Sequence, residues 1–593
     1  MARGPQEHGI RASHPPLGTD GPDGDAPDRP GQEPTTGFIP VPEMIRQLAV
    51  AQPATTAVIC GRQRLDYGGL ESETVRIASW LLATGHRHGD RVALLASPSV
   101  AYVTAIVAAL RAGLVAVPLA PSATPEALLA MIADAGAKTV FADVAGCALL
   151  GLEPRPGLGL VLLGRTAELD ESVAGAARDG SAAARLGPLE IGPQAPFNII
   201  YSSGTTGTPK GIVQPHGMRW SHVDRARLSD YGPGCVTLLS TPLYSNTTLV
   251  SFFPTIALGG TVVLMDRFDS RRFLELAEEH RPTHAMLVPV QYRRLMDEPS
   301  FDRFDLGSFR QKFCTSAPFA AGLKREVLDR WPGGLTEYYG MTEGGGTCML
   351  KAHLHPDKLH TVGQPVPGHD IRLVDDAGHA VGRGEAGEVV GRSPAMMLGY
   401  HNRVAQTRET EWFDAAGHRF IRTGDVGRFD DDGFLVLMDR KKDMIISGGF
   451  NIYPSDLELV LSTHPEVAEA AVVGVPSDRW GETPVAWVVL RAAEPAAASG
   501  EQAQGPQQAG GEQAPGQQGR DEQRAEPQAS PDQVPDLQGR AAAIRDWVNA
   551  KVGKTQRLAD LIVVEALPRG TIGKVLKREL RDSYGQAAAP GPP

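Results

Sequence analysis

The sequence has few cysteines, no excess of positive charge and no predicted secretory signal, and each absence narrows what the chain can do. Its five cysteines are far apart and form no Cys-x-x-Cys pair, so they indicate neither a disulfide framework nor a zinc knuckle and suit a reducing cytosol. A net charge of −11 without a concentrated basic patch disfavours nucleic acids and anionic membranes as partners. The first residues have no apolar core and predict no signal peptide.

Long unbroken apolar runs are also missing. The two longest apolar stretches are residues 100–120, which contain Arg111 and Gly113, and residues 248–265, which contain Pro254. A membrane-spanning helix needs about 20 consecutive apolar residues. Each stretch therefore predicts a buried helix, a turn and a strand, and no membrane span.

What is present is the composition of a folded chain of several domains, with 593 residues of which 42% are hydrophobic. Residues 1–42 hold nine Pro and seven Gly, and residues 494–540 are rich in Gln, so both tracts are predicted to be disordered. Elsewhere amphipathic segments such as RRFLELAEEH alternate with short Val, Ile and Leu runs, which predicts an α/β fold with largely parallel sheets. These runs are VALLA, FNIIY, VTLLS, TVVLM and HAMLV.

The most informative segment is FNIIYSSGTTGTPKG at residues 197–211, an apolar strand that runs into a loop of small and hydroxylated residues. Small residues let backbone N–H groups approach phosphate oxygens, and Lys210 adds a positive charge. Pro209 before the lysine and Gly211 after it exclude the Walker pattern. The loop is predicted to bind phosphate through Ser202, Ser203, Gly204, Thr205, Thr206, Gly207 and Lys210.

The segment YSSGTTGTPKG resembles the phosphate loop of the adenylate-forming enzymes, a superfamily of acyl-CoA and aryl-CoA ligases, peptide-synthetase adenylation domains and beetle luciferases. Further segments resemble the family's motifs in the family's order. They are CTSAPFAAG at 314–322, YYGMTEGGG at 338–346, FIRTGDVGRF at 420–429, DRKKDMIISGGFNIYP at 439–454 and LPRGTIGKVLKREL at 567–580. Thr315 and Ser316 depart from the glycines that the family prefers there.

The resemblance implies a role for each matching residue. Those expected in catalysis are Lys574, Thr342, Glu343 and Lys210. Those expected to bind ATP or AMP, besides the phosphate loop, are Ser316, Ala317, Pro318, Tyr339, Asp425 and Arg440. Glu343 and Ser202 are expected to hold Mg²⁺, which suits oxygen ligands. Those expected at the acyl pocket are Tyr244, Asn246, Gly344 and Gly345, and those at the hinge and the coenzyme A tunnel are Lys442, Gly448 and Gly449.

The resemblance also implies a fold: a large N-terminal domain of two α/β subdomains and a small β-barrel-like part, joined by a hinge to a small mobile α+β domain. The corresponding boundaries are a leader at 1–42, the large domain at 43–438 and the hinge at 439–442. The small domain then spans 443–582, with the insert at 494–540 and a disordered tail at 583–593.

The implied reaction has two halves and uses ATP, Mg²⁺ and coenzyme A. A carboxylate attacks the α-phosphate of ATP to give an acyl-adenylate and pyrophosphate, and a thiol then displaces AMP. Coenzyme A is the favoured thiol because no carrier domain follows residue 582, with a separate acyl-carrier protein as the alternative. A non-catalytic nucleotide-binding regulator would be expected to lose Lys574 or Glu343, and both are present. A homodimer and a place in fatty acid metabolism are further expectations.

The segment TPLYSNTTLVSFFP at 241–254 bears on the acid. Asn246 stands where amino-acid-activating domains have an aspartate, and a buried ammonium without that partner would be costly, so amino acids are disfavoured. Many relatives have a histidine gate here. Tyr244, Ser245 and Asn246 occupy this segment, which leaves the gate unassigned.

Three weaker patterns have ordinary interpretations. GRGEAG at 382–387 matches a dinucleotide fingerprint but precedes a predicted strand, where that fingerprint needs a helix. HLHPDKLH at 353–360 offers three histidines for a metal, although its Pro and Asp favour a loop. LVPVQYRRLM at 287–296 has helical apolar spacing, which fits either a core-facing helix or a border of the acyl pocket.

Overall fold

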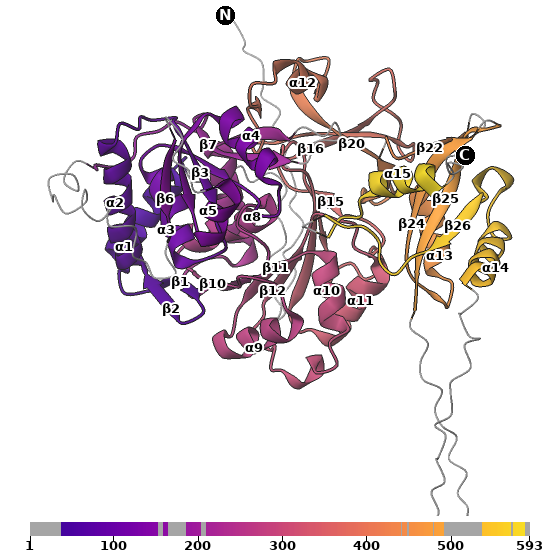
Figure 1. The fold of residues 1–593 in the computed structure, drawn as a ribbon, viewed down its shortest axis with the longest axis horizontal. Helices are drawn as coiled ribbons and strands as arrows, with labels where there is room; N and C mark the ends of the chain where they lie inside the picture. The colour runs from indigo at the N-terminus through magenta and orange to yellow at the C-terminus, as the bar shows by residue number, and fades with distance from the viewer. Residues whose placement is uncertain are drawn as a thin grey trace, which may run out of the picture.

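The structure is a computed structural model that describes residues 37–151, 158–163, 186–202, 209–440, 442–447, 450–477, 479–491, 537–570 and 573–587. The predicted site residues Ser203, Gly204, Thr205, Thr206, Gly207, Gly448 and Gly449 lie outside the described residues. In the described part the chain forms four sheets, three in the large part and one in a C-terminal unit (Figure 1).

The first sheet has seven strands and carries the predicted phosphate loop at one side. In spatial order its strands are β18 (Gly399–Tyr400), β8 (Lys210–Pro215), β7 (Pro196–Ser202), β4 (Val115–Pro118), β3 (Arg91–Leu95), β5 (Ala137–Ala142) and β6 (Gly159–Leu162). Its inner strands pair in parallel. The helices before and between these strands are α1 (Val41–Ala51), α2 (Tyr67–Ala83), α3 (Val100–Arg111), α4 (Pro125–Ala135) and α5 (Val144–Leu150).

The second sheet has nine strands. In spatial order they are β15 (Gln364–Pro365), β14 (Cys348–Lys351), β13 (Gly334–Tyr339), β12 (Gln311–Cys314), β11 (His284–Leu287), β9 (Val236–Leu239), β10 (Thr261–Leu264), β1 (Thr56–Cys60) and β2 (Gln63–Asp66). Its helices are α7 (His216–Ala226), α8 (Asn246–Ala257), α9 (Ser270–His280), α10 (Pro289–Met296) and α11 (Ala321–Arg330), with 3₁₀ turns η2 (Arg227–Ser229) and η3 (Phe301–Arg303).

The alternation of side chains along the strands builds a layered core. Successive residues of a strand point to opposite faces. In β10, Val262 belongs to the same cluster as Val92 of β3, whereas Val263 belongs to a cluster with α9, α10 and α11. Ala93 of β3 likewise faces α4 and α5 on the other side of the first sheet. The shared cluster therefore lies between the two sheets.

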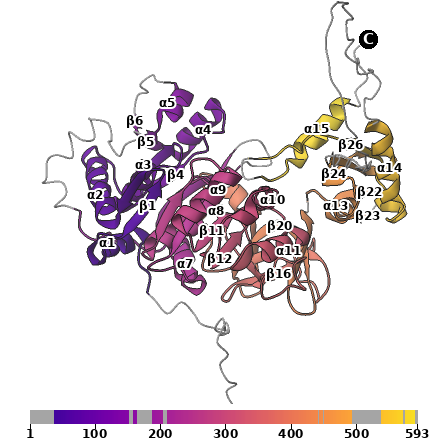
Figure 2. The same ribbon diagram turned by 90° about the horizontal axis from the view of Figure 1, so that it is seen from below.

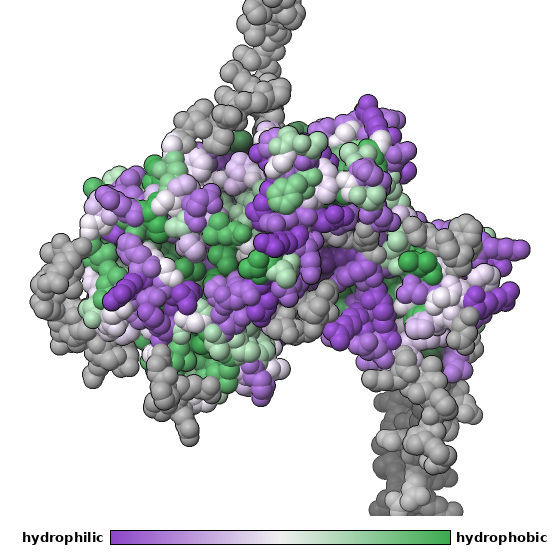
Figure 3. All heavy atoms as spheres, turned by 90° about the horizontal axis from the view of Figure 1, so that it is seen from above, coloured by the Kyte–Doolittle hydropathy of each residue, from purple (hydrophilic) through white to green (hydrophobic). Residues whose placement is uncertain are grey.

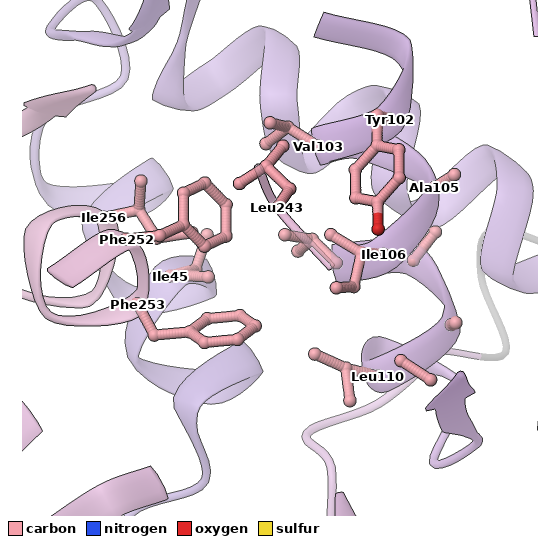
Figure 4. Packing of buried hydrophobic residues seen from close by; sticks show 14 of the residues in the cluster. Ile45, Tyr102, Val103, Ala105, Ile106, Leu110, Leu243, Phe252, Phe253 and Ile256 are labelled. Atoms are coloured by element: carbon pink, nitrogen blue, oxygen red, sulfur yellow. The ribbon is translucent and has the colours of Figure 1, made fainter. Parts of the chain in front are cut away.

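Helix α3 explains the apolar stretch that begins at residue 100. All twelve of its residues are buried, as expected for a helix that is hydrophobic on every side. It packs between the sheets with α1, α2 and α8 (Figure 4). The prediction of helix, turn and strand is confirmed for both stretches, as α3 then β4 and as α8 then β10. Within the described residues, we find no helix with the length and apolarity that crossing a bilayer requires.

The third sheet is antiparallel, and its last strand runs into the predicted hinge. Its strands are β16 (Asp370–Val374), β17 (Gly387–Arg392), β20 (Arg419–Phe429), β19 (Glu411–Phe413) and β21 (Leu435–Arg440), accompanied by α12 (Val404–Glu409). Strand β17 directly follows the glycines of GRGEAG, which confirms the predicted strand. The hairpin of β20 and β21 sets Asp425 opposite Arg440, so both reach the same edge of the large part.

The C-terminal unit forms a fourth, mixed sheet (Figure 2). Its strands are β23 (Phe450–Ile452), β22 (Ile445–Ser447), β25 (Gly481–Leu490), β24 (Val467–Ser477) and β26 (Asp560–Val563). Its helices are α13 (Pro454–Ser462), α14 (Leu537–Asn549) and α15 (Lys577–Ala587), with the 3₁₀ turn η4 (Lys554–Gln556). Helices α13 and α14 cover one face, where Leu457, Ile544 and Val548 share a buried cluster.

Three tracts predicted to be disordered were drawn too long, because a helix occupies one end of each. Helix α1 takes in Val41 and Pro42, which are buried, so the leader as predicted runs too far. Helix α14 includes 537–540, the last residues of the predicted insert, because its buried Ile544 and Val548 hold the whole helix against the sheet. Helix α15 continues through 583–587.

Candidate active site

A cavity of about 600 Å³ opens between the two large sheets, the third sheet and the C-terminal unit. This volume falls within the usual range for small-molecule sites. Of the residues predicted for the site, eight line the cavity: Ser202, Lys210, Asn246, Ser316, Thr342, Glu343, Arg440 and Lys574. Segments that lie hundreds of residues apart in the sequence, from Ser202 to Lys574, thus meet at one cavity.

Ser202 and Lys210 lie opposite each other at the mouth of the phosphate loop. Strands β7 and β8 are antiparallel, and the two residues form the last pair of their ladder. Lys210 Nζ lies 5.2 Å from the centre of the Tyr400 ring, and Tyr400 donates a hydrogen bond of 2.8 Å to Glu343 Oε1. This chain of contacts brings the loop lysine and the motif carboxylate to one wall.

Glu343 and Ser202 offer the oxygen donors that Mg²⁺ prefers. Both line the cavity, and Tyr400 engages one oxygen of Glu343. The donor set therefore fits a magnesium ion bound together with substrate phosphates. Elsewhere in the described part of the chain, no group of three or more His, Cys, Asp or Glu side chains is arranged to hold a metal. The histidines of HLHPDKLH lie in a region of turns.

A buried polar network holds Thr342 in place, and the sequence analysis missed it. Gln214 Nε2 donates to the Thr342 carbonyl at 2.6 Å and lies 3.3 Å from Asn246 Oδ1. Its own carbonyl oxygen accepts from Asn198 Nδ2 at 2.9 Å and also from Arg219. Burial lowers the pKa of Arg219 to about 9. The signal that could have found this network is one polar residue in each of two apolar strands, Asn198 in β7 and Gln214 in β8.

Two of the residues predicted to bind ATP or AMP, Tyr339 and Arg440, contact a third, Asp425. Tyr339 donates a hydrogen bond of 2.8 Å to Asp425 Oδ2, and Arg440 Nε lies 3.2 Å from Asp425 Oδ1. Ser316 adopts φ 82°, a left-handed conformation that glycine takes more readily, and its hydroxyl contacts Thr247. The preference of the family for glycine in this segment thus has a backbone reason, which this chain accommodates with serine.

Lys574 reaches the cavity from the C-terminal unit. It follows Gly573, which takes φ 79°, and precedes α15. Burial, followed by the positive charge of Arg440, lowers the pKa of Lys574 to about 8. The pKa of Lys442 is lowered as well, by burial first. Lys574 therefore lies at the cavity wall in surroundings where burial disfavours its positive charge.

Several predicted residues lie off the cavity wall. Tyr244, Gly344 and Gly345 do not line it, and the two glycines instead pack closely, since a Cβ on Gly344 would meet Ala395 O at 2.0 Å. Ala317 and Pro318 also lie outside the wall. Lys442 lies in the turn after β21 and does not line the cavity. The roles predicted for these residues remain predictions.

The comparisons with known proteins agree with this arrangement. The model of the AMP-binding enzyme family matches residues 45–401, and that of the AMP-binding enzyme C-terminal domain matches residues 456–504. The chain belongs to the AMP-binding enzyme family. Within this family of adenylate-forming enzymes it falls in the acyl-CoA ligase branch.

Three relatives illustrate the likeness to this AMP-binding enzyme. Feruloyl-CoA synthase of an Amycolatopsis species is 35% identical over 446 residues, 74% of this chain and 86% of the relative. The fatty acid–[acyl-carrier-protein] ligase ScoC of Streptomyces coeruleorubidus is 30% identical over 543 residues, 90% and 94% of the two chains. ATP-bound MatB from Rhodopseudomonas palustris superposes with a TM-score of 0.75 at 27% identity, covering 93% of this chain and all of MatB.

Proposed function

We propose that the protein is an ATP-dependent carboxylic acid–CoA ligase that releases AMP and pyrophosphate. The observation that carries this proposal is the meeting of Lys574 with Lys210, Thr342 and Glu343 around one cavity. A carboxylate is already a nucleophile, so the first half needs no general base. What it needs is stabilisation of charge at phosphorus, which cations and hydroxyl groups aimed at the phosphate provide.

In the first half, a carboxylate oxygen bonds to the α-phosphorus of ATP while the bond to pyrophosphate breaks. Lys210 and Lys574 stabilise the negative charge that develops on the phosphate oxygens, and the Thr342 hydroxyl donates to the α-phosphate. Asp425 accepts from the ribose hydroxyls, and Arg440 orients Asp425. Mg²⁺ held by Glu343 and Ser202 would neutralise phosphate charge.

In the second half, the thiol sulfur of coenzyme A bonds to the activated carbonyl carbon, AMP leaves and the thiol proton passes to solvent. We propose that the C-terminal unit, joined through a hinge at 439–442, rotates to withdraw Lys574 and to admit the thiol. The family likeness supports this step, and Lys442 lies in the turn where rotation would be absorbed. The five free thiols support a cytoplasmic location.

Two assays test the function on one preparation. Exchange of labelled pyrophosphate into ATP should require an added carboxylic acid, and release of AMP should then require coenzyme A. Lys574→Ala should reduce the exchange on the order of a hundredfold or more, because it removes a charge aimed at the transition state. Exchange that needs no acid would contradict the ligase reaction, and AMP release with a loaded carrier protein in place of coenzyme A would favour the carrier alternative that ScoC exemplifies.

A further inference from the structure

We propose that the acid activated by this enzyme carries a second negatively charged group at its far end, which Arg225 binds, with a dicarboxylate as the simplest case. This inference rests on the proposed ligase function and names the substrate class for the same cavity. It comes from charged and polar groups on helix α7, which the sequence motifs did not include.

Arg225 lies in the last turn of α7 and lines the cavity. Among the described residues no carboxylate comes within ion-pair distance of it. Its neighbours are the Tyr338 ring, 5.9 Å from the guanidinium carbon, and His369 Nε2, 3.3 Å from Nη1. Burial lowers the pKa of Arg225. A guanidinium withdrawn from water without an anion is costly, so a charge of opposite sign would stabilise it strongly.

His369 is a poor acceptor for Arg225. The Thr347 backbone N–H donates to His369 Nδ1 at 3.0 Å. Burial and the charge of Arg225 lower the pKa of His369 to about 3, so the ring is neutral. A neutral imidazole has one acceptor nitrogen and one N–H. With Nδ1 accepting from Thr347, Nε2 carries the hydrogen, and two donors then face each other. Arg225 is therefore left with donors that no described protein oxygen accepts.

His222 adds a second polar group beside Arg225. It lies one turn earlier on α7, lines the cavity, and its Nδ1 is buried without a hydrogen-bond partner among the described residues. Burial, then the charges of Arg225 and Arg219, hold the pKa of His222 well below its usual value. Arg219, a further turn back, donates to Asn198 and Gln214 and does not line the cavity, although its Nη1 has no partner among the described residues. His222 thus places a second polar nitrogen without a partner among the described residues at the cavity wall beside Arg225.

The rest of the wall combines apolar side chains, such as Val250, Met286 and Phe313, with polar ones. Hydroxylated or amide side chains line it from several loops and helices, namely Ser229, Ser245, Asn246, Thr247, Thr315, Ser316 and Thr347. The acidic residues of the wall have other partners or stand apart, since Glu343 accepts from Tyr400 and Glu388 from Arg422. A second carboxylate at Arg225 would therefore meet a cation without displacing an existing ion pair.

Matched pairs of acids test the proposal on the full chain. Adenylation is measured by pyrophosphate exchange with the dicarboxylates from succinate to suberate and with terephthalate, each against its monomethyl ester, which keeps one carboxylate and loses the second charge. We expect kcat/KM for the best dicarboxylate to exceed that for its monoester by on the order of a hundredfold, as buried charge pairs contribute strongly.

Three variants locate the effect. Arg225→Gln should abolish the preference by lowering kcat/KM for the dicarboxylate while the monoester value is kept or raised, which also shows that the variant is folded. Arg225→Lys should keep part of the preference. Arg227→Gln is the matched control, because Arg227 lies just beyond α7, half exposed, and pairs with Asp224. It should change nothing.

The outcomes separate this inference from the function on which it rests. Two results would contradict the proposed second negative charge on the substrate and leave the ligase function in place. One is that the wild type uses monoesters or other monocarboxylic acids as well as or better than dicarboxylates. The other is a preference for dicarboxylates that survives Arg225→Gln. Hydroxy acids used as well as dicarboxylates would overturn it too. Failure of every acid to support exchange, with ATP bound, would count against the ligase function itself.

Discussion

The charge proposed for Lys574 in catalysis conflicts with the surroundings of its side chain. The proposed role of this lysine in stabilising the developing phosphate charge needs a positive charge, yet burial and Arg440 make that charge less favourable and lower the pKa of Lys574 to about 8. A lysine in water titrates near pH 10.4. Lys574 therefore loses its proton at a pH at which the enzyme can be assayed.

We predict an alkaline limb in the pH profile of adenylation. Because only protonated Lys574 stabilises the transition state, kcat/KM should fall as the pH rises through about 8, the value for the free enzyme. Initial rates of pyrophosphate exchange across the alkaline range measure this. Lys574→Arg serves as the control, since a guanidinium does not titrate there and should move the limb upward. An identical limb in that variant would assign it to another group.

At the scale of elements, much of the fold could be predicted because strand runs and motif loops carry local signals. FNIIY lies wholly in a strand, VALLA, VTLLS, TVVLM and HAMLV each lie in a strand except for their last residue, and RRFLELAEEH lies in α9. The segment at 287–296, left open between core and pocket, turns Tyr292 and Leu295 of α10 into the core. The start of helix α14 was not predicted because residues 537–540 resemble the insert in composition. Their helical structure depends on the packing of Ile544 and Val548 later in the same helix.

The candidate site was predicted in part for a similar reason. Motif residues such as Thr342 and Glu343 stand in recognisable strings, whereas their supports do not. Gln214 holds Thr342 only because β8 passes behind the motif loop, and Arg225 enters the cavity only because of how α7 packs on α8. Such contacts depend on tertiary geometry, which no single segment of sequence encodes.

The Gln214 network yields a prediction that separates stability from positioning. Gln214→Ala should lower the free energy of unfolding by about 2–3 kcal/mol, because it removes an acceptor of the buried Arg219. Gln214→Glu should keep the fold, since a carboxylate pairs with Arg219, but it cannot donate to the Thr342 carbonyl. We therefore expect adenylation to fall by about tenfold in Gln214→Glu, the value of one lost hydrogen bond.

Denaturant unfolding and exchange kinetics on the same preparations check both parts. The change in Gln214→Glu should appear in kcat more than in the KM for ATP, because the displaced Thr342 is expected to act on the α-phosphate in the transition state. Full adenylation activity in Gln214→Glu would show that the hydrogen bond from Gln214 to the Thr342 carbonyl does not position Thr342 for the reaction. A stable Gln214→Ala would show that Arg219 finds another acceptor.

At the scale of the whole molecule, the C-terminal unit meets the large part along a hydrophilic boundary. Hydrophilic residues gather beside the hollow between the two parts (Figure 3). Lys577 of α15 lies 3.9 Å from Asp439 of β21, and the Ser455 amide of α13 donates a hydrogen bond of 3.1 Å to the same carboxylate. Interfaces of this polar kind can separate and form again more readily than apolar ones. A boundary of this kind is consistent with the rotation proposed between the two half-reactions.

Two substitutions should separate those half-reactions. Lys574→Ala should remove most adenylate formation and spare the conversion of purified acyl-adenylate with coenzyme A, because the lysine is withdrawn in that step. Lys442→Pro should do the reverse, since proline fixes φ near −65° and restricts the hinge. The Lys442 amide donates no hydrogen bond to the described residues and its φ is not positive, so proline should leave the adenylating arrangement accessible. Both rates are measured by quenched reactions on the same preparations, with circular dichroism as the check on folding. Equal loss of both half-reactions in the two folded variants would exclude alternation of the domains while leaving the ligase chemistry in place.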